Sequence, residues 1–164
     1  NVEAHTLNLD KLFESFENSM KKFENDHGMA NSRARLRMTT LYQVAAANKG
    51  IVVGTGNKVE DFGVGFYTKY GDGGVDISPI ADCNKTDVWE MGKELNILKE
   101  IIDAAPTDGL WDDGRTDEGQ LGLQYSELEE AMNNINSLNR EKYEKIRKLN
   151  LHKMEPIPVC KIPN

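Results

Sequence analysis

The feature that most constrains the fold is a short apolar segment, Ile51–Val53, which runs directly into a glycine-rich stretch from Gly54 to Lys85. A fully apolar strand of this kind is typical of a parallel sheet that is covered on both faces. A helical pattern precedes the segment and a Gly-Thr turn follows it, which together make half of a βαβ unit. Ligands of such sheets bind beyond the carboxyl ends of the strands, so we expect a binding site at residues 55–60.

A second glycine-rich block, Thr68–Gly74, has the sequence TKYGDGG. Its Asp-Gly pair alone would fit a type I′ hairpin turn. A plain hairpin would not need Gly71, Gly73 and Gly74 together, whereas glycines let a backbone approach a ligand closely. Acids and lysines held between glycines suit a magnesium-bound polyphosphate. The block therefore favours a ligand-binding loop over a solvent-exposed hairpin.

The bulk composition is that of a single domain spanning residues 1–164. A net charge of −7, from 20 basic and 27 acidic residues, argues against a general nucleic-acid binder. The apolar runs are far shorter than the roughly 20 residues needed to cross a bilayer, and residues 1–30 show no signal-peptide pattern. Cys83 and Cys160 form no CxxC motif. We therefore expect a reduced, cytoplasmic protein without membrane or nucleic-acid partners.

Helical periodicity and capping residues predict several helices. These are a helix over residues 9–24, a second one capped by Asn31 and ending near Asn48, a third capped by Asn84 with Asp87, a short one over Leu98–Ala104, one opened by Ser126-x-x-Glu129 and ending near Ile135, and a last one over Asn139–Leu149. Residues 56–84 and 106–120 are expected to be irregular, mobile loops, and residues 154–164 a tail wrapping the surface. The expected divisions are a preceding helix in residues 1–28, a nucleotide-site region over residues 31–125, and C-terminal helices and tail over residues 126–164.

Most single candidate residues carry little information alone. Glu60 could ligate magnesium, which prefers hard oxygen ligands, yet a lone acid is more often a solvated surface residue. Arg35 could reach a phosphate through its planar guanidinium group. Most of the three arginines at positions 33, 35 and 37 are instead expected to pair with acids. Lys85, Thr107 and His152–Lys153 carry no signal by themselves.

Seven segments together resemble motifs of the ammonia-dependent NAD synthetase family, in the family's order and nearly its spacing. These segments are NSRARLRMTTLY (31–42), VVGTGNKVE (52–60), FYTKYGDGGVDISPI (66–80), NKTDVW (84–89), APTDGLWD (105–112), DEGQLGLQY (117–125) and HK (152–153). The TKYGDGG block with its flanks is highly specific. The resemblance extends from about residue 31 to residue 153.

The resemblance implies an α/β fold of the adenine-nucleotide alpha-hydrolase-like (ATP-pyrophosphatase) type, with a Rossmann-type parallel sheet. This chain would supply the C-terminal, helix-rich part of that fold. Members of the family begin with a strand and an SGGxDS loop that grips pyrophosphate and supplies a second magnesium-ligating aspartate. The 164 residues contain no such motif. We therefore expect the C-terminal portion of a synthetase domain, inactive without the remainder.

The family makes NAD from deamido-NAD, ATP and ammonia, which are the partners that the resemblance implies. The nicotinate carboxylate attacks the α-phosphorus of ATP, pyrophosphate leaves, and ammonia then displaces AMP from the acyl-adenylate. Magnesium and lysine would offset the charge on pyrophosphate, and no residue is expected to act as a nucleophile. By resemblance, Thr55, Lys85 and Thr107 would contact ATP, Glu60 would ligate Mg²⁺, and Arg35, Lys69, Asp76, His152 and Lys153 would hold deamido-NAD.

Three alternatives follow from these observations. The leading one is an amide-forming ligase that acts as a homodimer, as the resemblance implies. A second is a non-catalytic nucleotide-binding or dimerisation fragment. A third, a GMP or asparagine synthetase of the same fold, is disfavoured because those relatives lack the TKYGDG block followed by Asp76 and Lys85. Whether ammonia is free or supplied by a glutaminase domain stays open.

Overall fold

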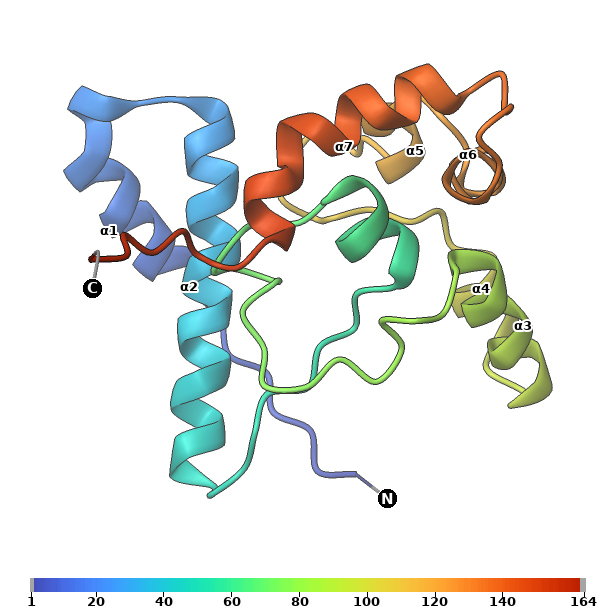
Figure 1. Ribbon diagram of the computed structural model, residues 1–164. Helices are drawn as coiled ribbons and strands as arrows, with labels where there is room; N and C mark the ends of the chain where they lie inside the picture. The colour runs from blue at the N-terminus through green and yellow to red at the C-terminus, as the bar shows by residue number, and fades with distance from the viewer. Residues whose placement is uncertain (1, 163–164) are drawn as a thin grey trace.

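The computed structural model describes residues 2–162, in which helices make up nearly all of the regular structure (Figure 1). The elements are α1 (Asp10–Met20), the 3-10 turn η1 (Lys21–Phe23), α2 (Asp26–Ala47), the π-helix η2 (Lys58–Val64), α3 (Lys85–Glu94), α4 (Lys99–Ile102), α5 (Asp117–Leu121), α6 (Tyr125–Asn133) and α7 (Arg140–Met154). None of the helices in residues 2–162 combines the length and apolarity that a membrane span requires.

Helix α2 begins at Asp26, earlier in the sequence than the predicted cap at Asn31 would allow. The Asn25 side chain caps the helix instead, because its Oδ1 accepts a hydrogen bond from the Gly28 amide at 2.8 Å. Asn31 lies inside the helix, and its Oδ1 accepts a 2.6 Å hydrogen bond from the Thr68 hydroxyl. The predicted cap at Asn31 is therefore wrong, and Asn31 joins the helix to the TKYGDGG block.

The apolar segment at residues 51–53 forms only one isolated parallel bridge, between Val53 and Ile77. The Gly54 amide donates to the Ile77 carbonyl at 2.7 Å, and the Asp76 amide donates to the Val52 carbonyl at 2.9 Å. Val52 is 7% exposed, but Ile51 and Val53 are 59% and 53% exposed. A strand is covered on both faces only where helices and neighbouring strands surround it. The expected parallel sheet is therefore not confirmed within residues 2–162.

The described hydrophobic core lies where η2, α6 and α7 pack together (Figure 1). Its buried members are Val59, Val64, Leu121, Leu123, Tyr125, Leu128, Ala131 and Tyr143. The predicted irregularity of residues 56–84 is wrong at its start, since η2 is helical. Asn57 caps it, accepting hydrogen bonds from the Val59 amide at 3.0 Å and the Glu60 amide at 3.1 Å. This cap places Val59 in the core and leaves Glu60 at its edge.

The later helices confirm some predictions and correct others. The Asn84 amide donates to Asp87 at 2.8 Å, as expected for the start of α3. Helix α6 is capped by Gln124, whose amide donates to Glu127 at 2.8 Å, and not by the predicted Ser126 and Glu129 pair. Glu129 instead accepts hydrogen bonds from the amide and hydroxyl of Thr86 at 3.0 and 2.7 Å, which ties α6 to α3.

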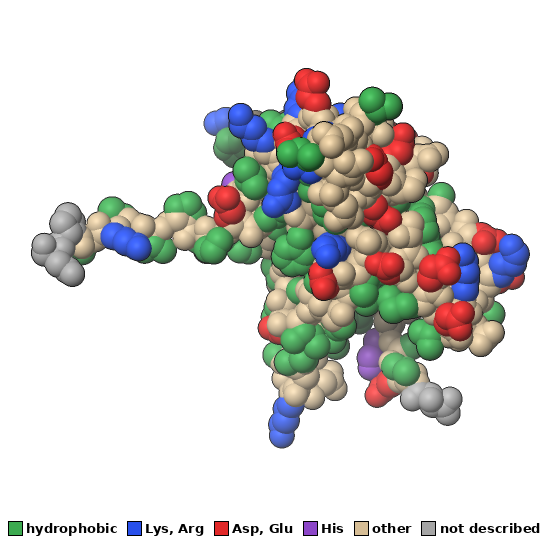
Figure 2. Space-filling view, turned by 45° about the vertical axis from the view of Figure 1, so that its right-hand side comes forward, with side chains coloured by type: hydrophobic (Ala, Val, Ile, Leu, Met, Phe, Trp, Pro, Cys, Tyr) green, Lys and Arg blue, Asp and Glu red, His purple; other side chains and the backbone are tan. Residues whose placement is uncertain are grey.

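The C-terminal region differs from the prediction in two ways. Helix α7 continues to Met154, so His152 and Lys153 belong to its last turn and not to the tail. Residues 155–162 are all exposed, and Figure 2 shows this end of the chain extending away from the body of the molecule. The predicted wrapping of the tail over the surface is therefore wrong.

The core makes a specific prediction for stability. Leu128 is fully buried, so Leu128→Ala should lower the free energy of unfolding by about 2–5 kcal/mol through lost burial and a residual cavity. The matched control is Leu138→Ala, because Leu138 is fully exposed and should change stability by less than about 0.5 kcal/mol. Urea unfolding of both variants measures the difference. Equal destabilisation by the two substitutions would contradict the described core.

Candidate functional site

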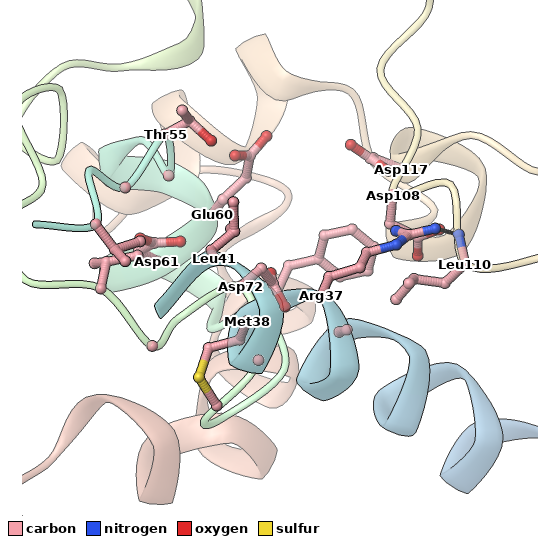
Figure 3. Close-up of a pocket in the computed structure, with 18 of the residues that line it drawn as sticks. Arg37, Met38, Leu41, Thr55, Glu60, Asp61, Asp72, Asp108, Leu110 and Asp117 are labelled. Atoms are coloured by element: carbon pink, nitrogen blue, oxygen red, sulfur yellow. Dashed lines mark hydrogen bonds between the residues drawn. The ribbon is translucent and has the colours of Figure 1, made fainter. Parts of the chain in front are cut away.

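An open cavity of about 440 Å³ lies where the 52–54 segment, α2, η2 and the start of α3 meet (Figure 3). Four residues predicted to hold ATP or magnesium line it, namely Thr55, Glu60, Lys85 and Thr107. They come from the turn after the 52–54 segment, from η2, from the first turn of α3 and from the loop before α5. The sequence-based expectation of a site beyond the carboxyl end of this segment is consistent with their placement.

The glycines around this cavity are needed for contacts within the protein itself. A Cβ atom added at Gly56 would lie 2.0 Å from the Asp61 carboxylate, and one at Gly54 would lie 2.9 Å from Val75. A Cβ atom at Gly71 would lie 2.9 Å from Ala34 of α2. Real Cβ atoms do not approach so closely, so larger residues would push apart the walls of the cavity. Glycine here shapes the pocket before any ligand is considered.

Glu60 is held by two donors at the edge of the core. Its Oε1 accepts a hydrogen bond from the Lys85 ammonium at 3.1 Å and another from the Tyr125 hydroxyl. The side chains of Lys85 and Glu60 are 19% and 15% exposed, so this ion pair is largely shielded from water. The Lys85 ammonium also lies 5.0 Å from the centre of the Tyr125 ring, at a cation–π distance.

Asp117 and Tyr125 complete this polar cluster, and sequence reasoning gave neither a role. The Tyr125 hydroxyl lies 3.2 Å from Asp117 Oδ2 as well as within hydrogen-bonding distance of Glu60. Asp117 Oδ1 is buried and has no hydrogen-bond partner. The motif DEGQLGLQY contains both residues, but nothing in their spacing indicated that they meet Glu60.

Burial and neighbouring charge shift several pKa values around the cavity. Burial raises the pKa of Asp117, and the negative charge of Glu60 raises it further. The pKa of Tyr125 is raised by its burial and by the adjacent carboxylate of Glu60, so the phenol keeps its proton. Burial also raises the pKa of Asp61 to about 6, with a further contribution from Glu60. The cavity is therefore strongly unfavourable to added negative charge unless cations accompany it.

None of the five residues predicted to hold deamido-NAD is among those that line this cavity. Lys153 lines a neighbouring cavity of about 100 Å³, where its ammonium donates to the Gly65 and Tyr67 carbonyls at 2.8 and 2.7 Å. The Lys69 ammonium donates to the carbonyl of His152, whose side chain is exposed. These contacts attach the TKYGDGG block to the last turn of α7.

Arg35 and Asp76, also predicted for deamido-NAD, take part in backbone contacts. Arg35 Nε donates to the Lys69 carbonyl at 3.3 Å. Asp76 Oδ2 accepts a hydrogen bond from the Val52 amide at 2.7 Å, and its Oδ1 accepts one from the Tyr42 hydroxyl at 3.2 Å. The structure thus brings Arg35, Lys69, His152 and Lys153 to one region, whereas Asp76 stands beside the parallel bridge.

Two arginines of α2 hold the loop before α5 against that helix. The sequence instead predicts that most of the arginines at positions 33, 35 and 37 pair with acidic side chains. Arg33 donates to the Leu110 carbonyl at 3.0 Å, and Arg37 donates to the Gly109 carbonyl at 2.8 Å. Arg33 also lies 3.5 Å from the exposed Asp112 carboxylate. The contacts to carbonyls place Thr107 and Asp108 over the cavity, and the expected mobility of this loop stays a prediction.

The donors around Glu60 suit a magnesium ion better than a metal held by protein alone. Within residues 2–162 no group of three or more His, Cys, Asp or Glu side chains is arranged to hold a metal. Magnesium usually takes one or two carboxylates, and phosphates and water fill its other positions. Glu60 keeps one oxygen outside its contacts with Lys85 and Tyr125, and Asp117 has an unpaired buried oxygen beside it. This oxygen-only set fits the ion that the resemblance implies.

Comparison with known proteins gave concordant matches. Residues 1–162 match the NAD synthase family. The NH(3)-dependent NAD(+) synthetase of Carboxydothermus hydrogenoformans is 41% identical over 133 residues, covering 79% of this chain and 54% of that protein. The chain thus spans about half the length of this curated relative.

Two solved structures are similar to the chain. NMN synthetase from Francisella tularensis has a TM-score of 0.91 and 33% identity, covering 98% of this chain and 68% of that one. The NH3-dependent NAD synthetase from Campylobacter jejuni has a TM-score of 0.69 and 23% identity, covering 94% of this chain and 64% of that one, and supports the fold alone.

The raised pKa of Asp61 predicts a pH dependence of stability. Between pH 7 and pH 5 the folded protein takes up a proton at Asp61, whose folded pKa is about 6, while the unfolded carboxyl stays ionised. The free energy of unfolding should therefore be about 1 kcal/mol higher at pH 5 than at pH 7, and this extra stability is lost as the pH rises through 6. Asp61→Asn should lack this gain. Urea unfolding of both proteins at the two pH values measures it, and identical pH dependence would refute the assignment.

Proposed function

The chain belongs to the NAD synthase family, and from this premise we propose that it is part of an enzyme that amidates deamido-NAD with ammonia at the expense of ATP. The observation that carries the proposal is the cavity that gathers Thr55, Glu60, Lys85 and Thr107. The nicotinate carboxylate would attack the α-phosphorus of ATP, with pyrophosphate leaving. Ammonia would then attack the acyl-adenylate, releasing AMP and NAD.

The chain's own residues would act by positioning and by electrostatics. Lys85 stands at the first turn of α3, where helix amides also favour an anion, so it suits a phosphate of ATP. The hydroxyls of Thr55 and Thr107 would hydrogen-bond the nucleotide from two sides of the cavity. Glu60 would hold Mg²⁺, which when bound would offset the charge that develops on pyrophosphate.

The deamido-NAD site would lie where α2, the TKYGDGG block and the last turn of α7 meet. Support for this location comes from Arg35, Lys69, His152 and Lys153, which occupy that region. Asp76 lies nearer the parallel bridge, and we propose that it contacts the substrate only in addition to its bond with the Val52 amide. The homodimer and the cytoplasmic location stay predictions of the resemblance.

A more extensive parallel sheet of the adenine-nucleotide alpha-hydrolase type is part of the same proposal. The parallel bridge between Val53 and Ile77 supports it, because parallel pairs occur almost only in α/β sheets covered by helices. The exposure of Ile51 and Val53 supports it further, since apolar strand residues are normally covered. Additional strands and helices beside this segment would bury both side chains.

A second candidate function differs in the size of the substrate. The structure similar to this chain with a TM-score of 0.91 is described as an NMN synthetase. The same adenylation and amidation chemistry would then act on nicotinic acid mononucleotide, which lacks the adenylate half of deamido-NAD. The cavity residues around Glu60 would keep the same roles in either case.

The activity prediction compares two forms of the protein. Residues 1–164 alone should give no NAD from deamido-NAD, ATP, Mg²⁺ and ammonium, because the SGGxDS motif is not among them. The same residues fused behind the corresponding upstream part of the Carboxydothermus hydrogenoformans relative should turn over. In the fusion, Lys85→Met should lower kcat by about 10²-fold, as expected for loss of a charged group that stabilises the transition state.

The control for this assay is Lys93→Met, which removes an exposed lysine paired with Glu90 on the same helix. It should leave kcat unchanged within about twofold. Exchange of labelled pyrophosphate into ATP that depends on deamido-NAD would separate adenylation from ammonia transfer. No exchange in a folded fusion would contradict the proposed ligase and favour the non-catalytic nucleotide-binding alternative.

The choice between dinucleotide and mononucleotide is tested in the same fusion. If deamido-NAD is the substrate, kcat/KM for it should exceed that for nicotinic acid mononucleotide by about tenfold or more, which corresponds to roughly 1.4 kcal/mol of transition-state binding. Competition between the two substrates, followed by product chromatography, measures the ratio directly. A ratio reversed in favour of the mononucleotide would replace the first candidate by the second.

A further inference from the structure

The polar cluster around Tyr125 holds too few protons for its two carboxylates. One phenol hydroxyl lies within hydrogen-bonding distance of both Glu60 Oε1 and Asp117 Oδ2. A hydroxyl has a single hydrogen and can donate to only one of them. Glu60 is also paired with the Lys85 ammonium at 3.1 Å, whereas the only side-chain partner of Asp117 in the cluster is this hydroxyl.

Asp117 is the partner left without compensation. Its side chain belongs to a residue that is only 7% exposed, and its Oδ1 is buried with no hydrogen-bond donor. Asp117 nevertheless lines the cavity, and Figure 3 shows its carboxylate and that of Glu60 facing one another across the space between them. A buried, unpaired carboxylate oxygen destabilises the folded protein unless a cation or a hydrogen-bond donor reaches it.

The cavity wall supplies too little positive charge for this purpose. Five acids line the cavity, namely Glu60, Asp61, Asp72, Asp108 and Asp117, against two bases, Arg37 and Lys85. Arg37 donates to the Gly109 carbonyl, and Lys85 pairs with Glu60. Both oxygens of Asp108 already accept hydrogen bonds, from the Leu110 amide at 3.0 Å and from Gln120 at 3.1 Å. Asp61 and Asp72 are more exposed to solvent than Asp117, so Asp117, with its buried and unpaired oxygen, is the acid that most requires an added cation.

We propose that Asp117 is a further carboxylate ligand, in addition to Glu60, that this chain supplies to a divalent cation bound in the cavity, with Asp117 Oδ1 as the donor atom. Tyr125 holds the two carboxylates next to each other, so that one ion reaches both. Two carboxylates with open positions for phosphate and water match the preference of Mg²⁺. The inference rests on the proposed function only for the choice of Mg²⁺ as the ion.

The test measures Mn²⁺ binding to the 164-residue chain, with free Mn²⁺ followed by electron paramagnetic resonance. Mn²⁺ shares the preference of Mg²⁺ for oxygen ligands. Asp117→Asn keeps the shape of a protonated aspartate but removes the charge, and it should raise the Kd for Mn²⁺ by about tenfold or more. Glu60→Gln should have an effect of similar size. Asp103→Asn, which removes an exposed acid paired with Lys99 on α4, should leave the Kd within about twofold.

Two outcomes would overturn the proposal. One is wild-type Mn²⁺ affinity in Asp117→Asn, which would mean that Asp117 holds a shared proton and not a cation. The other is the absence of saturable Mn²⁺ binding to the wild-type chain at millimolar concentrations. If circular dichroism shows that Asp117→Asn is unfolded, Asp117→Ser removes the same charge with a smaller side chain and is judged by the same criterion. Failure of NAD formation would leave these titrations unaffected, so the two proposals fail independently.

Discussion

Tyr125 joins the hydrophobic core to the polar cavity, and the arrangement of both depends on it. Its ring is fully buried and packs edge-on against Trp89, with the ring centres 6.0 Å apart. Its hydroxyl lies at the carboxylates of Glu60 and Asp117. The packing that excludes water from the ring therefore also fixes two acids from distant parts of the sequence beside each other. A phenol is suited to this boundary because it is apolar over the ring and polar at one end.

Polar side chains of α7 hold the other end of η2 in place by hydrogen-bonding its backbone carbonyls. This π-helix ends at Val64 and is capped by Gly65, and several carbonyls at this end accept hydrogen bonds from side chains of α7. Arg147 donates to the carbonyls of Phe62 and Gly63, Asn150 to that of Val64, and Lys153 to those of Gly65 and Tyr67. From the sequence alone, Arg147 and Lys153 would be assigned to a solvent-exposed face of the helix. In the structure they donate to backbone carbonyls, as expected when an irregular segment is buried.

How far the sequence predicts this structure depends on how local each interaction is. The cap of α3 by Asn84 and Asp87 lies within four residues and was predicted correctly. The cap of α2 was misplaced because both Asn25 and Asn31 are good capping residues, and only the contact of Asn31 with Thr68 distinguishes them. The meeting of Tyr125 and Glu60 bridges 65 residues, so neither periodicity nor spacing could indicate it. Resemblance to a family located four of the cavity residues, whereas Asp117 required the packing.

The glycines of the TKYGDGG block have a role within the protein that their sequence pattern did not indicate. They were interpreted as giving a ligand access to the backbone. In the structure, Gly71 allows the block to touch Ala34 of α2, and Gly73 leaves room for the Tyr67 ring, 2.4 Å from where a Cβ atom would stand. Contact with α2 and enclosure of the cavity are consequences of the same close approach, because the block that packs on α2 also forms the cavity wall. A larger residue at Gly71 would therefore alter the pocket through the helix and not through a clash with the ligand.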